Sequence, residues 1–280
     1  MLGKLIKYEW KNLSRKFLIM LAILVVTTLV SSLMIISINF DFDQVNDYYS
    51  AFMMMGSILI YYLGGIICSL GTSLIIAIRF YKSCYTDAGY LTHTLPVSAH
   101  QLVGAKTFTA CLVQFLSLIC IFLSSGVYIA VMLTAILNSS ASFTFGELSM
   151  TLIITDFEQE LGMSVVQYVI FLLVYSIIGC ITGVCILLGC VSLGQLYTKH
   201  RVLGAIIAYF AVTMIMQIVS GLALIPTYGK MLVASTTGET FSMMDILMPV
   251  FIFVLIINIA VAIAMYFINI HMMTKKLNLE

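Results

Sequence analysis

The chain has 280 residues, of which 62% are hydrophobic and only 9% are charged, and its mean hydropathy is +1.12. A soluble domain carries about 25% charged residues, so a water-soluble protein of this size is excluded. The composition is that of an integral membrane protein. The apolar runs leave no segment long enough for a soluble catalytic domain, which excludes a built-in ATPase, kinase or dehydrogenase module.

Six apolar runs have the length of about 20 residues that a spanning helix needs. Backbone groups inside a bilayer must satisfy their own hydrogen bonds, so each run predicts a transmembrane α-helix. The predicted fold class is therefore all-α integral membrane, with one transmembrane domain over residues 1–280. The runs cover roughly Phe17–Asn39, Ala51–Ile78, Ala105–Leu137, Val165–Leu193, Val202–Ile225 and Ile246–Ile268.

The charges sort to opposite sides of this six-span arrangement. Twelve of the 13 basic residues fall on the side that holds both ends of the chain, and only Lys230 falls opposite. Nine of the 12 acidic residues fall on the side of Lys230. Basic residues are retained in the cytoplasm, so we expect both ends to be cytoplasmic and the acidic side to be the outer one. Two outer segments, Asn138–Ser164 and Pro226–Asp245, are candidate gates or plain loops.

The spans contain no deep ionisable group, which argues against a proton-driven antiporter. No P-loop and no HExxH motif occurs, so energy for uphill transport would come from another chain.

Gly179 and Gly183 form a GxxxG pair, which permits close helix approach. The cysteines predict neither a disulfide nor a metal site, and nothing in the sequence predicts a nucleic-acid partner. Uncharged polar residues in the spans either hold helices together or line a cavity, and three of the four form a candidate substrate path: Gln114, Gln217 and Asn258, with Gln167 as the fourth.

Residues 1–16 predict an amphipathic helix that lies in the membrane interface. At 100° per residue its basic side chains, Lys4, Lys7, Lys11 and Arg15, fall on one arc, and its apolar side chains, Leu2, Leu5, Ile6, Trp10 and Leu13, fall on the opposite arc. Trp10 suits the depth of the lipid headgroups. Glu9 falls on the apolar arc, where a carboxylate needs a partner. Either it reaches solvent or pairs with Lys16, or it contacts a neighbouring protein element.

The inner connection over residues 79–104 is the longest on its side. Pro96 ends any preceding helix, and Ser98 with Gln101 predicts a capping box that starts the helix entering the third span. Residues 86–94 can form a short surface helix that exposes Tyr90 and Leu91. Such exposed apolar side chains indicate a docking surface, and the alternative is a capped turn that lies on the headgroups.

Two motifs resemble the permease subunits of ABC exporters of the second type, especially those of Gram-positive bacteria. One is Leu5-Ile-Lys7-Tyr-Glu9-Trp-Lys11 before the first span. The other follows the second span as Arg79-Phe-Tyr81-Lys82, Asp87-Ala-Gly89-Tyr90-Leu91 and Leu95-Pro96-Val97-Ser98. Many relatives have Glu where Asp87 stands, and the substrates of the family vary too widely to transfer.

The resemblance implies a dimer of permeases in which each copy recruits a separate P-loop ATPase subunit. The loop after the second span would be the coupling helix. It would place Asp87, Gly89, Tyr90, Leu91, Leu95, Pro96, Val97 and Ser98 at the ATPase contact. ATP and Mg would bind the partner, and this chain would bind no cofactor and catalyse no reaction.

We therefore expect a multi-pass subunit of a bacterial plasma-membrane exporter that contacts lipid, an ATPase and a second permease, identical or related. A charge-free membrane interior suits amphipathic or apolar substrates such as peptides, antibiotics or lipids. The alternative is a membrane scaffold or sensor subunit that holds a cytoplasmic partner without transport. A channel is disfavoured because charged pore rings are lacking.

Overall fold

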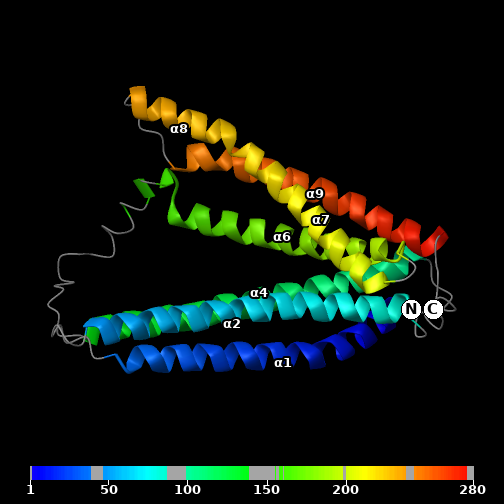
Figure 1. The fold of residues 1–280 in the computed structure, drawn as a ribbon, viewed down its shortest axis with the longest axis horizontal. Helices are drawn as coiled ribbons and strands as arrows, with labels where there is room; N and C mark the ends of the chain where they lie inside the picture. The colour runs from blue at the N-terminus through cyan, green and yellow to red at the C-terminus, as the bar shows by residue number, and fades with distance from the viewer. Residues whose placement is uncertain are drawn as a thin grey trace. The chain divides into compact units, whose positions relative to one another are not determined.

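The computed structural model describes residues 2–38, 47–86, 99–138, 155, 158–159, 161–197, 200–237 and 243–275 (Figure 1). Its elements are α1 (Leu2–Ile36), α2 (Asp47–Cys84), α4 (Ala99–Asn138), α6 (Val165–Gly194), α7 (Arg201–Ala223), α8 (Ile225–Thr237) and α9 (Met243–Lys275). Among the described residues, six segments are long and apolar enough to cross a membrane: Leu5–Ile36, Tyr48–Cys84, His100–Ala135, Val165–Gly194, Arg201–Lys230 and Leu247–Thr274. The part of the chain that the structure describes is thus helical and has six helices that could cross a membrane, as predicted for a multi-pass membrane protein.

Two elements differ from the prediction. Residues 2–36 form one continuous helix, so the interface helix expected over 1–16 is not separate from the first span. The connection after the fifth span, Pro226–Asp245, expected as a candidate gate or a plain loop, contains α8. Pro226 lacks the N–H that would continue the α7 ladder, and the chain turns there through bonds from the Thr227 and Tyr228 amides to the Leu224 carbonyl, each 3.1 Å.

The chain divides into two compact units. Unit 1 contains residues 1–79 and 108–144, and unit 2 contains residues 80–107 and 145–280. Most of α2 and most of α4 belong to unit 1. The last residues of α2 and the first residues of α4 belong to unit 2. The charges along the six spans define two ends of the bundle: the basic side, where 12 of the 13 basic residues fall, and the acidic side, where nine of the 12 acidic residues fall.

In unit 1, α1, α2 and the body of α4 lie side by side (Figure 1). Glycines of α2 let α1 approach closely: a Cβ at Gly64 would lie 2.6 Å from the Thr27 Cβ, and one at Gly71 would lie 2.5 Å from the Met20 Sδ. Inside a membrane, the burial of apolar surface does not drive helices together. Small residues at helix contacts instead allow the backbones to approach closely and pack by van der Waals contact.

Hydrogen bonds join α2 to α4 along their length. The Ser57 Oγ lies 3.1 Å from the Tyr128 hydroxyl oxygen, and the Tyr61 hydroxyl oxygen lies 3.2 Å from the Ser124 Oγ. The Thr72 Oγ1 lies 3.3 Å from the Ser117 Oγ. The rings of Tyr61 and Tyr128 are also stacked, with centroids 4.6 Å apart. Uncharged polar side chains in unit 1 thus hold helices together.

In unit 2, α6 packs against both α7 and α9. The buried residues of α6 all lie from Cys180 onward, in its basic-side half. There Ile186, Cys190 and Met265 form a buried apolar cluster, with Ala208 and Val212 of α7 packed against it. The packing of these helices is therefore closest toward the basic side.

Glycine permits this close packing, although not at the predicted pair. A Cβ at Gly194 would lie 2.5 Å from the Ala205 nitrogen, and one at Gly189 would lie 3.0 Å from the Met265 carbonyl oxygen. Around Gly179 and Gly183 nothing lies within 4 Å of a Cβ. The GxxxG pair thus mediates no close contact among the described residues of this chain.

Candidate functional site

The predicted ATPase-contact residues, Asp87, Gly89, Tyr90, Leu91, Leu95, Pro96, Val97 and Ser98, lie outside the described residues. The two ends of their loop are described. At the second end, α4 begins at Ala99, directly after Ser98, the residue predicted to cap it. Ser98 itself lies outside the described residues. The structural evidence on this region therefore comes from residues 80–86 and 99–107, which we call the loop root.

The first end of the loop root is fixed by a buried chain of hydrogen bonds inside unit 2. The Tyr85 hydroxyl donates to the Ser192 Oγ at 2.9 Å, and the Ser192 hydroxyl lies 2.7 Å from the Asn269 Oδ1. All three side chains are at most 1% exposed. Burial raises the pKa of Tyr85 well above its usual range, so its hydroxyl stays protonated and can donate. Tyr85 thereby ties the loop root to the basic-side ends of α6 and α9.

A buried cation joins the two ends of the loop root. The ammonium of Lys106, in α4, donates to the Ser83 Oγ of α2 at 2.6 Å, and Lys106 is only 5% exposed. A buried ammonium is costly unless it is hydrogen-bonded, so this contact favours one arrangement of the two chain ends. The loop is thus closed at its base by a charge-assisted bond.

In unit 1, Glu9 has a partner on α2. Its Oε2 accepts from the Arg79 Nε at 3.2 Å. With the Asn12 amide oxygen turned toward Arg79, it accepts from both terminal nitrogens of the guanidinium at 2.9 and 3.0 Å. Of the alternatives for Glu9, contact with a neighbouring protein element is the one seen, whereas pairing with Lys16 is not.

The surroundings of Glu9 also correct the expected orientation of its helix. Leu13 is 4% exposed and Phe17 is 5% exposed, so the arc that contains Glu9 faces protein instead of lipid. Lys7, Trp10 and Lys11 are exposed, and the side chain of Lys4 lies outside the described residues.

Replacing Glu9 with glutamine is expected to lower the free energy of unfolding by about 1.5–3 kcal/mol, the range for hydrogen bonds to charged groups. The reason is that a half-buried guanidinium keeps its charge while its carboxylate partner is removed. Thermal unfolding in detergent measures the effect. The control is Lys16→Gln, which changes an exposed charge and should leave the midpoint unchanged; equal shifts in the two variants would show that the Arg79 contact contributes nothing.

Two of the three predicted path residues share a pocket in unit 2. Gln217 of α7 and Asn258 of α9 line a pocket of about 570 Å³, together with Tyr175 and Ile186 of α6. The pocket volume lies within the range of small-molecule sites. Its walls are apolar except for a few hydroxyl and amide groups, among them Thr213 and Ser220. We call it the central pocket.

The other two polar span residues have structural roles. Gln114 belongs to unit 1, where its Oε1 accepts from the Ser73 hydroxyl of α2 at 3.5 Å. Gln167 forms a capping box with Ser164 at the start of α6, with bonds of 3.3 and 3.4 Å. Gln114 therefore belongs to a different unit from Gln217 and Asn258, and Gln167 caps the start of a helix instead of lining the pocket.

Sequence reasoning missed the buried chain at the loop root. The predicted last span ended at Ile268, one residue before Asn269, so this asparagine was not counted among the polar residues of the spans. Ser192 was overlooked because it stands in an apolar run, and Lys106 was counted only as a basic-side charge. The Asn269 amide, near the end of a hydrophobic run, was the one feature of the sequence that could have predicted a polar contact between helices here.

Comparison with known protein families, with curated proteins and with solved structures gave no match to this chain. The resemblance to exporter permeases therefore rests on the sequence motifs within residues 5–11 and 79–98.

Proposed function

We propose that this chain is the transmembrane subunit of an ATP-driven ABC exporter of the second type. It acts in the bacterial plasma membrane with both ends in the cytoplasm, as one of two permease copies or paralogues. Each permease binds a separate P-loop ATPase, which carries ATP and Mg. The chain performs no covalent chemistry and changes only the exposure of a substrate path.

The observation that carries the proposal is the hydrogen-bonded anchoring of the loop root. A segment that receives force from a partner must be joined rigidly to the elements that move. Tyr85 reaches α6 through Ser192 and α9 through Asn269 at 2.9 and 2.7 Å. Displacement of the loop by a closing ATPase would therefore pass to these two helices.

The helices α6 and α9 are also walls of the central pocket. Tyr175 and Ile186 of α6 lie on one side of it, and Val254 and Asn258 of α9 lie on another. A shift of these helices would change the pocket, which gives the partner's ATP cycle a physical route to the substrate path. The apolar walls with a few neutral hydrogen-bonding groups suit amphipathic or apolar molecules, such as peptides, antibiotics or lipids.

The first helix supports the same proposal in a different way. Lys7 and Lys11 are exposed on its basic arc, where they attract anionic headgroups of the cytoplasmic leaflet at about 1 kcal/mol per charge. Trp10, also exposed, fits the interface. This helix would hold the basic end of unit 1 at the membrane surface while its Glu9 arc packs on protein.

Filling the central pocket tests the proposed path. Gly221 lines it, and a Cβ there meets nothing within 4 Å. The substitution Gly221→Leu adds an apolar side chain at the pocket wall, starting from an uncrowded Cβ position, and should lower export by about tenfold or more, the effect of a binding loss of about 1.4 kcal/mol. The measurement is accumulation of a panel of fluorescent amphipathic compounds in cells that lack the native copy and carry a plasmid copy.

The matched control is Gly126→Leu in α4, where a Cβ also meets nothing within 4 Å. It adds the same side chain to a span of unit 1 and should export like the wild type. If the wild-type chain lowers the accumulation of no compound in the panel, or if Gly221→Leu exports as well as Gly126→Leu, the central pocket is not the path of these substrates. A chain that binds its partner but exports nothing would fit the scaffold or sensor alternative.

A further inference from the structure

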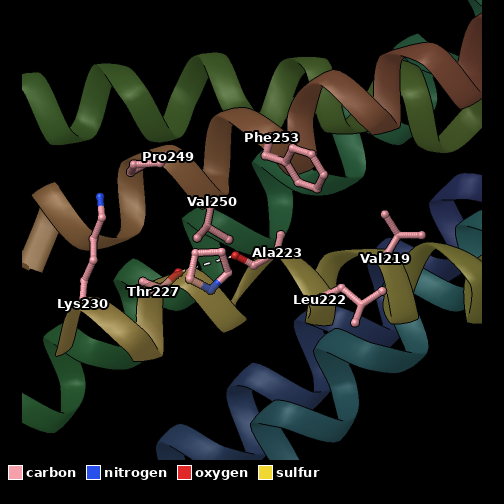
Figure 2. Close-up of a pocket in the computed structure, with 9 residues that line it drawn as sticks. Val219, Leu222, Ala223, Thr227, Lys230, Pro249, Val250 and Phe253 are labelled. Carbon is pink, nitrogen blue, oxygen red and sulfur yellow. Dashed lines mark hydrogen bonds between the residues drawn. The ribbon is translucent and has the colours of Figure 1, made fainter. Parts of the chain in front are cut away.

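A second pocket lies in unit 2 at the bend between α7 and α8. Its volume is about 450 Å³, and its walls come from α7, α8 and the beginning of α9 (Figure 2). Leu222, Val250 and Phe253 give it apolar walls. The Thr227 hydroxyl of α8 donates to the Ala223 carbonyl at the end of α7, across the bend, at 3.5 Å. The charged side chain among the residues that line this pocket is Lys230.

Helix lengths place this pocket at the acidic-side edge of the bilayer. Leu222 lies 21 residues after Arg201, or about 31 Å along a helix, and Lys230 lies eight residues farther, past the bend, or at most about 12 Å beyond Leu222. On α9, Phe253 lies 22 residues before Lys275, or about 33 Å. A hydrocarbon core is about 30 Å thick, and the headgroups extend the bilayer to about 40–45 Å. The apolar walls therefore reach the edge of the hydrocarbon, and Lys230 lies at the level of the headgroups.

The direction of Lys230 fits this depth. Figure 2 shows its side chain extending from α8 toward the first turns of α9, beside Pro249. Lys230 is the one basic residue on the acidic side of the chain, which carries nine of the 12 acidic residues. An anion near that side is repelled by most of the charges of the chain and attracted at this point, so the charge pattern favours an anionic group here.

We propose that this pocket binds an anionic amphiphile from the outer leaflet, with its phosphate or carboxylate head on Lys230 and its tail against Leu222, Val250 and Phe253. A lipid-like molecule is the occupant that matches a cation at headgroup depth directly beside an apolar hollow at hydrocarbon depth. The inference rests on the pocket, on the six-span topology and on the proposed orientation with both ends in the cytoplasm, and it does not depend on the ATPase partner or on transport.

The chain provides a site-specific probe, because it has a single tryptophan, Trp10. A Trp10→Phe, Phe253→Trp variant of the full chain carries its only indole in the pocket wall. The protein is reconstituted in vesicles of zwitterionic phosphatidylcholine, and tryptophan quenching is titrated with brominated-chain phosphatidylglycerol or brominated-chain phosphatidylcholine of matched chain length. Leu222→Trp in the same background serves as a second reporter, since Leu222 is 58% exposed and tolerates a larger side chain.

We expect phosphatidylglycerol to quench at roughly 2- to 5-fold lower mole fraction than phosphatidylcholine, the ratio that an exposed ion pair of up to about 1 kcal/mol gives. Lys230→Gln should remove this preference and Lys230→Arg should keep it. Lys11→Gln, which removes an exposed lysine from the basic side, should leave the preference unchanged.

Three outcomes would overturn the proposal: equal quenching by the two lipids, a preference that persists in Lys230→Gln, or release of the anionic lipid by millimolar inorganic phosphate, which would make the site one for free anions. A further variant, Asp245→Asn in the first turn of α9, tests whether Lys230 serves only to pair with a carboxylate of the chain. In that case Asp245→Asn would abolish the lipid preference as fully as Lys230→Gln. A lipid site keeps the preference in Asp245→Asn.

Discussion

Substituting Gly194 with valine is expected to lower the free energy of unfolding by about 3 kcal/mol, the upper end of the usual cost of overpacking. A Cβ at this position would lie 2.5 Å from the backbone nitrogen and 2.6 Å from the Cα of Ala205. Backbone atoms cannot rotate away as a flexible side chain can, so α6 and α7 would have to separate where unit 2 is most tightly packed. Thermal unfolding in detergent and the yield of monodisperse protein measure the loss.

The control is Gly183→Val in the same helix. It introduces the same branched side chain and the same change in helix propensity, but a Cβ there meets nothing within 4 Å. Its unfolding midpoint should stay close to that of the wild type. If the two variants unfold at the same temperature, the close approach of α6 and α7 at Gly194 is not a feature of the folded protein.

Removal of the Tyr85 ring is the second substitution that should lower the free energy of unfolding strongly. Tyr85→Ala deletes a side chain that is 1% exposed, and loss of a buried aromatic residue costs about 3–5 kcal/mol. Tyr85→Phe keeps the ring and removes only the bond to Ser192, which contributes about 1 kcal/mol. The milder variant therefore separates the role of the hydrogen bond from that of packing.

Under the proposed function, Tyr85→Phe should still recruit the ATPase while less of its ATP hydrolysis is converted into export. The expected result is a severalfold fall in the ratio of transport to hydrolysis in proteoliposomes, with an unfolding midpoint only slightly lowered. Tyr197→Phe, which removes a hydroxyl from a residue that is 57% exposed, is the matched control. An unchanged ratio in Tyr85→Phe would mean that the buried chain stabilises the fold without transmitting motion.

The number and type of the spans could be predicted from the sequence because a run of about 20 apolar residues has one stable solution in a bilayer. Contacts between helices could not be predicted in the same way. The GxxxG pair at Gly179 and Gly183 was the sequence signal for close approach, yet the close contacts occur at Gly189 and Gly194. Hydropathy is nearly uniform around α6, so it does not indicate which face meets a neighbouring helix.

The polar contacts show the same limit. The charge of Glu9 on an apolar arc predicted that it needs a partner, but the partner is Arg79, 70 residues away. Asn269 escaped notice because hydropathy gives the centre of a span better than its ends. The amides Gln114, Gln167 and Gln217 are alike in sequence, and only the fold separates a contact between helices, a cap and a pocket wall.

The central claim is that residues of the 79–104 loop hold a separate ATPase. Its most direct test is affinity purification in mild detergent, from the native host, of the wild type and of a Tyr90→Ala, Leu91→Ala double variant, with P-loop ATPases identified by mass spectrometry. The matched control is Tyr228→Ala, Leu232→Ala on α8, which removes the same two side-chain types from exposed positions near the opposite side of the membrane.

We predict that a P-loop ATPase accompanies the wild type and the α8 control and is lost from the loop variant, while all three proteins remain monodisperse. Recovery of no P-loop ATPase with well-folded wild-type protein, or equal recovery with the loop variant, would contradict the account.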